Sequence, residues 1–199
     1  MKFLYINTYI LGLLLLLNNI SFSENVQITT NGGYHPRFSP DNSKIAFTNS
    51  WNNEPNLFIV DADGSNETHI ETGLSGDYHL SWHPDGTRIF FDAFQPGTYN
   101  YNIYSIPIAG GTPTKLQVSP DGNEIAPYCA LDGSKVSYMK YYGGGGYAYT
   151  SVSGGAEETI FTTTMSIGWQ SLSADGNVLA FCAAEGDWTD NNFDIYTVP

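Results

Sequence analysis

The chain has 199 residues and a net charge of −13, with 14 tyrosines, 21 glycines and only 14% charged residues. Its length fits one domain, and its abundance of aromatic residues and glycine predicts many short strands and tight turns rather than helices. The negative charge disfavours binding to nucleic acid or anionic lipid, because both would be approached against electrostatic repulsion.

The first 23 residues have the pattern of a secretory signal peptide. Lys2 provides a positive start, residues 9–17 form an apolar run too short to span a bilayer comfortably, and Ser21-Phe22-Ser23 resembles a cleavage site. We therefore expect a signal peptide at 1–23 and one folded domain at 24–199. The mature protein would be periplasmic or secreted and not inserted in the membrane. Its net charge would be −14, because Lys2 is the only charged residue removed.

The rest of the chain repeats itself four times with a period near 45 residues. Each copy contains a turn aspartate, an apolar strand after it, and a third strand that carries a tyrosine or phenylalanine; the aspartates are 44, 47 and 43 residues apart. This period and content predict an all-β propeller built from four-stranded antiparallel blades. The turn residues are Asp41, Asp85, Asp132 and Asp175, followed by Asn42, Gly86, Gly133 and Gly176.

In the first repeat we expect strands at 34–38, 44–48 and 56–60 and an outer strand that ends at Ile70. Between the first two, the aspartate of the turn can accept a hydrogen bond from the backbone two residues on, and the position after it requires a positive φ. The second strands of the four repeats carry matching large residues that should pack between neighbouring blades. They are Ile45-Ala46-Phe47, Ile89-Phe90-Phe91, Val136-Ser137-Tyr138 and Leu179-Ala180-Phe181.

The two ends of the repeat region leave two arrangements open. Residues 26–29 have the composition of an outer strand, whereas the last repeat has only three strands before Pro199. Either the N-terminal strand completes the last blade and closes a four-bladed ring, or the four blades are part of a larger propeller. Ring closure would remove the exposed sheet edges that favour aggregation.

Three motifs of the first repeat identify a family. They are His35-Pro36-Arg37-Phe38-Ser39-Pro40-Asp41, then Ile45-Ala46-Phe47, then Leu57-Phe58-Ile59-Val60-Asp61-Ala62-Asp63-Gly64. This pattern resembles the repeat of the TolB-like β-propeller family over residues 26–199, although Leu131 and Ala174 replace the turn proline in the later repeats. The α/β domain that precedes the propeller in TolB has no counterpart here. The resemblance implies a periplasmic or secreted protein-interaction scaffold with six blades or more.

The loops between the second and third strands are long and variable, and they share the face opposite the Asp-Gly turns. Binding residues often occupy such loops on a rigid frame; the alternative is that these loops are solvated connections. We place the candidate partner-binding residues on this face, with two histidines at the mouth of the channel. They are Trp51, Asn52, Phe94, Tyr99, Tyr141, Tyr142, Trp188, His35 and His79.

His35 and His79 occupy equivalent positions at the start of the innermost strand. Two imidazoles at a pore mouth can contribute to a transition-metal site, as in propeller-shaped oligogalacturonate lyases, whose repeats this chain resembles. The equivalent positions in the other repeats are Ala126 and Trp169, which supply no further ligand. A structural role is therefore favoured, and no metal or cofactor is expected.

The sequence favours a binding protein over an enzyme. It contains no Gly-x-Ser-x-Gly, His-Glu-x-x-His or phosphate-loop motif. The only cysteines, Cys129 and Cys182, occupy different positions in their repeats, which favours two free thiols over a disulfide. We interpret the chain as an exported scaffold for a protein or glycan partner. The alternatives are a metal-dependent lyase and the propeller part of a truncated peptidase similar to prolyl oligopeptidase.

Overall fold

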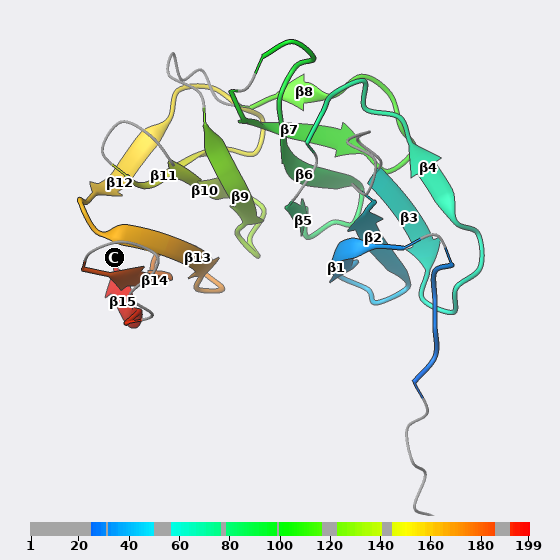
Figure 1. Cartoon of the computed structure of the whole chain (residues 1–199), viewed down its shortest axis with the longest axis horizontal. Coiled ribbons are helices and arrows are strands. Elements are labelled where there is room, and N and C mark those ends of the chain that lie inside the picture. The colour runs from blue at the N-terminus through cyan, green and yellow to red at the C-terminus, as the bar shows by residue number, and fades with distance from the viewer. Residues whose placement is uncertain are drawn as a thin grey trace, which may run out of the picture.

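The computed structural model is an arc of four β-sheets, blades 1 to 4, whose innermost strands face the inside of the arc (Figure 1). The structure describes residues 25–30, 32–49, 57–76, 79–98, 100–116, 123–140, 145–185 and 192–199. Within these ranges, no helix is long and apolar enough to cross a membrane. The predicted all-β propeller architecture is confirmed.

Each blade is an antiparallel sheet whose strands follow the chain order from the inside of the arc outward. Blades 1, 2 and 3 have four strands, and blade 4 has three. The strands are β1 (Tyr34–Phe38), β2 (Lys44–Thr48), β3 (Leu57–Asp61) and β4 (Thr68–Ile70) in blade 1; β5 (Leu80–Trp82), β6 (Arg88–Ala93), β7 (Asn102–Pro107) and β8 (Thr114–Lys115) in blade 2; β9 (Glu124–Cys129), β10 (Lys135–Lys140), β11 (Gly146–Ser151) and β12 (Glu158–Thr162) in blade 3; β13 (Ser166–Leu172), β14 (Leu179–Ala184) and β15 (Asp194–Val198) in blade 4.

Closure of the ring by the N-terminal segment, one of the two predicted arrangements, is wrong. Residues 26–29 form no strand, and the sheet of blade 4 consists of β13, β14 and β15 alone. The backbone of Ile28 instead packs against Gly64, in the turn between β3 and β4 of blade 1. The segment thus lies on its own blade, and blades 1 and 4 form the two open ends of the arc (Figure 1).

The short turns between the first and second strands repeat one hydrogen-bonding arrangement. In blade 2, Asp85 accepts hydrogen bonds from the backbone N–H and the hydroxyl of Thr87, and Gly86 has a φ of 72°. These bonds from Thr87, backbone first, lower the pKa of Asp85 to about 2. The equivalent acceptor bonds from the residue two positions on are made by Asp41, Asp132 and Asp175, and the following residues Asn42, Gly133 and Gly176 also have positive φ.

The core consists of three apolar layers, one between each pair of adjacent blades. Alternate residues of a second strand point to opposite neighbours, so Phe91 packs toward blade 1 and Phe90 toward blade 3. Both rings are fully buried. The layers contain Ala46, Leu57 and Ile59 against Ile89, Phe91 and Tyr104; Phe90, Ile103 and Leu116 against Val136, Tyr138 and Ala148; and Met139 and Tyr147 against Leu179, Phe181 and Ala183.

Both cysteines are free thiols, as the sequence predicted. Cys129 lies within the layer between blades 2 and 3, and its burial raises the pKa of the thiol to about 12. Cys182 lies on β14 and is half-buried. The two thiols therefore differ in access, and the buried Cys129 should be inert to thiol reagents.

Truncation of a ring in the blade 2 to blade 3 layer should destabilise the whole protein. We expect Phe90→Ala to lower the free energy of unfolding by about 3–5 kcal/mol, because it leaves a cavity between two blades. Leu131→Ala, at an exposed turn position, should change it by less than about 0.5 kcal/mol. Urea unfolding of the two variants measures the difference, and equal effects would contradict the layered core.

The turn aspartates should contribute to stability only above acidic pH. Because the pKa of Asp85 is about 2 in the folded chain and about 3.9 when unfolded, the contribution of Asp85 is complete above pH ~4 and is lost as the pH falls toward ~2. Asp85→Asn keeps an acceptor oxygen but does not titrate. Unfolding midpoints measured between pH ~5 and ~2 should therefore fall less steeply in the variant, and identical slopes would contradict the assignment.

Candidate functional site

The innermost strands carry bulges at equivalent positions. The pairing register shifts between Tyr34 and Arg37 in β1, at residues 126–127 in β9, and between Ile167 and Gln170 in β13. Two of the bulged residues, His35 and Ala126, have left-handed φ values of 52° and 55°. Proline follows each of them, and a residue without an N–H donor is suited to a bulge. Bulges redirect side chains, and here they lie at the inner edge of the blades.

The bulge positions bring three rings into a row across the inside of the arc. The His35 and His79 ring centroids are 5.0 Å apart, and those of His79 and Trp169 are 5.2 Å apart. These residues come from blades 1, 2 and 4. The contact between His79 and Trp169 therefore joins blade 2 to blade 4, which does not follow it directly in the chain, because equivalent repeat positions converge on one axis.

A buried carboxylate holds the middle of this row. Asp92 of β6 is fully buried; its Oδ2 lies 2.6 Å from His79 Nδ1 and accepts the backbone N–H of Ala126 at 2.8 Å. Its Oδ1 accepts the backbone N–H of His79 at 3.0 Å. One side chain thus orients the His79 ring and the bulge of blade 3, as buried charges require hydrogen-bonding partners.

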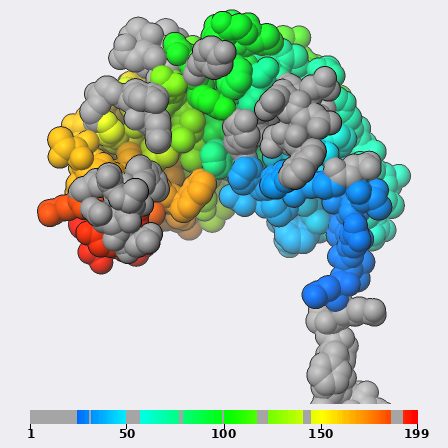
Figure 2. All heavy atoms as spheres, in the orientation of Figure 1, coloured from blue at the N-terminus to red at the C-terminus, as the bar shows by residue number. Residues whose placement is uncertain are grey.

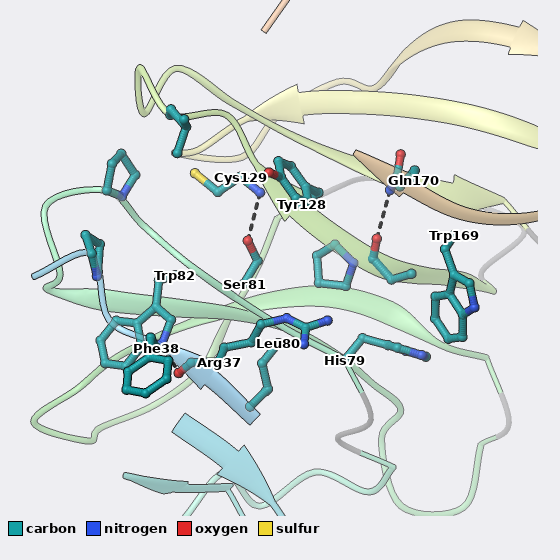
Figure 3. A pocket seen from close by; sticks show the side chains of 15 residues that line it. Arg37, Phe38, His79, Leu80, Ser81, Trp82, Tyr128, Cys129, Trp169 and Gln170 are labelled. Atoms are coloured by element: carbon teal, nitrogen blue, oxygen red, sulfur yellow. Dashed lines mark hydrogen bonds between the residues drawn. The ribbon is translucent and has the colours of Figure 1, made fainter. Parts of the chain in front are cut away.

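One side chain to backbone hydrogen bond links each successive pair of innermost strands. Trp82 Nε1 donates to the Arg37 carbonyl at 3.0 Å, and Ser81 Oγ accepts the Cys129 N–H at 2.9 Å. Gln170 Nε2 donates to the Ala126 carbonyl at 2.8 Å. Figure 3 shows the last two bonds on opposite sides of the pocket. The strands are thereby tied together without forming a continuous sheet.

A pocket of about 420 Å³ lies between these strands and takes residues from all four blades. Its lining is mainly apolar and aromatic, and Trp169, 66% exposed, stands at one end beside His79 (Figure 3). The polar groups in the lining include the Arg37 guanidinium and Gln170. A concave, largely apolar lining with a few placed polar groups is the usual character of a binding site.

The electrostatics of the pocket differ from those of the whole chain. Arg37 places a permanent cation in the lining of a protein whose net charge is −13. Gln170 Oε1 is buried and has no hydrogen-bond partner among the described residues. Burial, and then the neighbouring His79, lower the pKa of His35. The site can therefore bind an anionic group beside aromatic surface.

Only some of the predicted binding residues fall within the described structure. His79 lines the pocket, and the ring of His35 packs against the ring of His79. The ring of Phe94 instead packs edge to face on Tyr101, with ring centroids 5.0 Å apart. The backbone of Phe94 forms an antiparallel β-bridge with Ser75. The other predicted residues lie outside the described residues: Trp51, Asn52, Tyr99, Tyr141, Tyr142 and Trp188.

Sequence reasoning did not single out Arg37, Asp92, Trp169 and Gln170 as site residues. One signal was present for Asp92, since the equivalent positions hold Thr48, Met139 and Cys182, and an acid in such a column is unusual. Trp169 was aligned with the histidines, but its exposure on the axis depends on the bulge in β13. The pocket also extends toward the short-turn ends of the strands at Phe38 and Leu131.

The described residues offer no complete metal site. Within them, no group of three or more histidine, cysteine, aspartate or glutamate side chains is placed to hold an ion. His35, His79 and the buried Asp92 form a row in which Asp92 already accepts three hydrogen bonds. This arrangement fits a structural tie between blades better than an open coordination sphere.

Comparison with known families decides the assignment. The sequence model of the TolB β-propeller domain matches residues 15–194. The chain belongs to the TolB β-propeller domain family. This agrees with the resemblance carried by the first repeat. No curated protein matches the sequence.

Solved structures share the fold at low sequence identity. A TolB-family chain from Agrobacterium tumefaciens, described as a putative TolB, aligns with a TM-score of 0.71 at 19% identity, over 82% of this chain and 60% of that one. TolB from Acinetobacter baumannii aligns with a TM-score of 0.69 at 19% identity, over 88% of this chain and 43% of that one. An oligogalacturonate lyase from Vibrio parahaemolyticus aligns with a TM-score of 0.64 at 16% identity, over 87% of this chain and 52% of that one. The present chain thus spans 60% or less of the length of each of these solved chains.

The histidine row should make the stability of the protein sensitive to mild acid. Because the pKa of His35 is lower in the folded chain than its ordinary value of about 6.5, the unfolded chain binds more protons and stability falls as the pH drops below ~6.5. His35→Asn suits the left-handed φ and does not titrate. Thermal unfolding between pH ~7.5 and ~5 should show a smaller decline in the variant. An equal decline in both proteins would contradict this role.

Proposed function

We propose that this chain is an exported, non-enzymatic TolB-family scaffold that binds a protein or glycan partner at its axial pocket. The observation that carries the proposal is the pocket itself, which places Trp169 and Arg37 on a lining built from all four blades. Tryptophan and arginine are the residues that most often dominate binding energy at interfaces. The four blades supply the rigid frame that such a site requires.

The choice of ligand class follows from the chemistry of the lining. The exposed Trp169 ring offers a flat face to an aromatic or aliphatic side chain or to a sugar ring. The Arg37 guanidinium can pair with a carboxylate. These groups occur in peptide segments and in glycans alike, whereas the net charge of −13 opposes polyanions such as nucleic acid.

Export and localisation rest on the sequence of residues 1–23, with their positive start, apolar run and cleavage-like end. A periplasmic or secreted protein would meet partners of the cell envelope or the surroundings. We place the binding domain at residues 24–199. The predicted long-loop residues, among them Trp51 and Trp188, remain proposed contributors to partner binding.

The alternative is a metal-dependent enzyme, and the likeness in fold to an oligogalacturonate lyase supports it. Two histidines lie side by side at the axis, as such a site requires. The described residues provide no third ligand beside them other than Asp92, which is occupied with Ala126 and His79. Binding of a divalent cation such as manganese that is lost in a His35→Ala, His79→Ala double variant would favour this alternative.

A photo-crosslinking amino acid placed at Trp169 should capture the partner in intact cells, whereas the same group at Thr114, on the outer strand β8 and away from the pocket, should not. For the captured protein, or for a glycan selected from an array, we expect Trp169→Ala and Arg37→Ala to weaken binding at least about tenfold. Thr114→Ala is the matched control, as its exposed side chain on β8 does not line the pocket. Calorimetry would measure the affinity of the wild type and of each variant for this partner.

Each possible result of these binding experiments supports or contradicts one of the proposed functions. A partner bound equally well by the two pocket variants would show that the axial pocket is not the site. Retention of neither a protein nor a glycan by the wild-type chain would overturn the scaffold proposal. Turnover of an acidic oligosaccharide that requires a divalent cation would establish the enzyme instead.

A further inference from the structure

One position in the repeat is buried in three blades and exposed in the fourth. It lies on the forward face of each blade, the side that points to the next blade in chain order. In blades 1 to 3 this position holds Leu57, Ile103 and Tyr147. They pair with equivalent residues of the second strands, which are Thr48, Asp92 and Met139. Leu57, Ile103 and Tyr147 are all 0% exposed. The equivalent Ile195, paired with Cys182 in blade 4, is 75% exposed.

The rest of the blade 4 forward face is also apolar. Ala180 and Cys182 alternate along β14 on this face, with Ile195 beside Cys182 on β15. Val178 directly precedes β14 and continues the alternation. Val178 is 40% exposed. The positions equivalent to Val178 in the other three blades carry the cations Lys44, Arg88 and Lys135. Blade 4 thus has an apolar side chain where its covered counterparts have a charged one.

The existing layers show what chemistry covers a forward face. The covering blade presents an aliphatic residue and, two positions later, an aromatic residue from its second strand. These pairs are Ile89 and Phe91, Val136 and Tyr138, and Leu179 and Phe181. Blade 1 carries the same pair in the same register, Ile45 and Phe47, on its rear face, where no blade precedes it in the arc (Figure 1).

The rear face of blade 1 is only partly covered. Phe47 is buried beside Gly33, whereas Ile45 and Phe58 are half-buried. The segment 25–30 lies near this end of the arc without joining a strand, and Val26 is 72% exposed. Within the described residues, the sheet of blade 4 at the other end has three strands and those of the other blades have four. The two ends therefore carry complementary features.

We propose that this chain associates head to tail with a second copy of itself, the forward face of blade 4 packing on the rear face of blade 1. The contact is a further instance of the blade-to-blade layer that the chain already makes three times. Ile195 and Val178 of one copy would meet Ile45 and Phe58 of the other. The segment 25–30 of that second copy would lie beside β15.

Electrostatics set the condition under which this contact forms. Two chains of charge −13 repel one another, whereas the contact surfaces are apolar. Added salt screens the repulsion and leaves apolar burial intact. Association should therefore strengthen as ionic strength rises, which is the opposite of what an ion-paired interface would do.

Sedimentation velocity over a range of concentrations and salt tests the proposal directly. We expect the wild-type chain to self-associate, and Ile195→Asp to weaken association at least about tenfold. Leu131→Asp is the matched control, because Leu131 is 62% exposed and lies at the pocket rather than on blade 4's forward face. It should associate as the wild type does.

A mixing experiment distinguishes head-to-tail packing from a symmetric contact. Ile195→Asp keeps an intact rear face on blade 1, and Ile45→Asp keeps an intact forward face on blade 4. Each variant alone should be a monomer, and an equal mixture should form a one-to-one dimer that grows no further. A symmetric contact through blade 4 would leave the mixture with no such dimer.

The thiol of Cys182 gives a readout that needs no variant. It is half-buried on the forward face, whereas Cys129 is buried in the core. Alkylation of Cys182 in the wild-type chain should slow as the protein is concentrated, with Cys129 unreactive throughout. A monomer at every concentration and salt, a labelling rate that does not change, or a longer natural chain whose next blade covers Ile195 would overturn the proposal.

Discussion

Burial of both faces of every sheet is the constraint on which this structure depends. A blade of three or four short strands has too little core to be stable alone, and its stability comes from packing both faces against neighbours. Phe90 and Phe91 show this most clearly, since adjacent residues of one strand are fully buried in two different layers. The repeat is therefore a unit of packing, and each blade stabilises the next one.

Packing against neighbours also creates the candidate site. Because every blade directs its innermost strand to the same axis, equivalent positions meet there, although they lie about 45 residues apart in sequence. The bulges in β1, β9 and β13 turn those positions inward. The buried Asp92 then orients His79 and the blade 3 bulge together. The pocket is a property of the assembled arc, and no single repeat contains it.

The open ends of the arc connect assembly to the site. Blade 4 contributes Trp169 and Gln170 to the pocket, while its forward face carries the exposed Ile195. Its position is set from its rear face and from the axis, by the layer with blade 3, by the hydrogen bond from Gln170 to Ala126 and by the contact of Trp169 with His79. Figure 2 shows the C-terminal strands at one end of the arc and the N-terminal part of the described chain at the other. Whatever covers the forward face would therefore also hold one wall of the pocket in place.

The sequence by itself determined the blade, because the determinants of a blade are local. The turn aspartates with Asn42, Gly86, Gly133 and Gly176, and the apolar second strands, act within one repeat and could be read residue by residue. The tertiary structure decided how the repeats meet. Residues 26–29 have the composition of a strand but pack on blade 1, because strand propensity does not specify a pairing partner. Asp92, Trp169 and Gln170 form a site only because distant bulges share one axis, and no spacing along the chain records that.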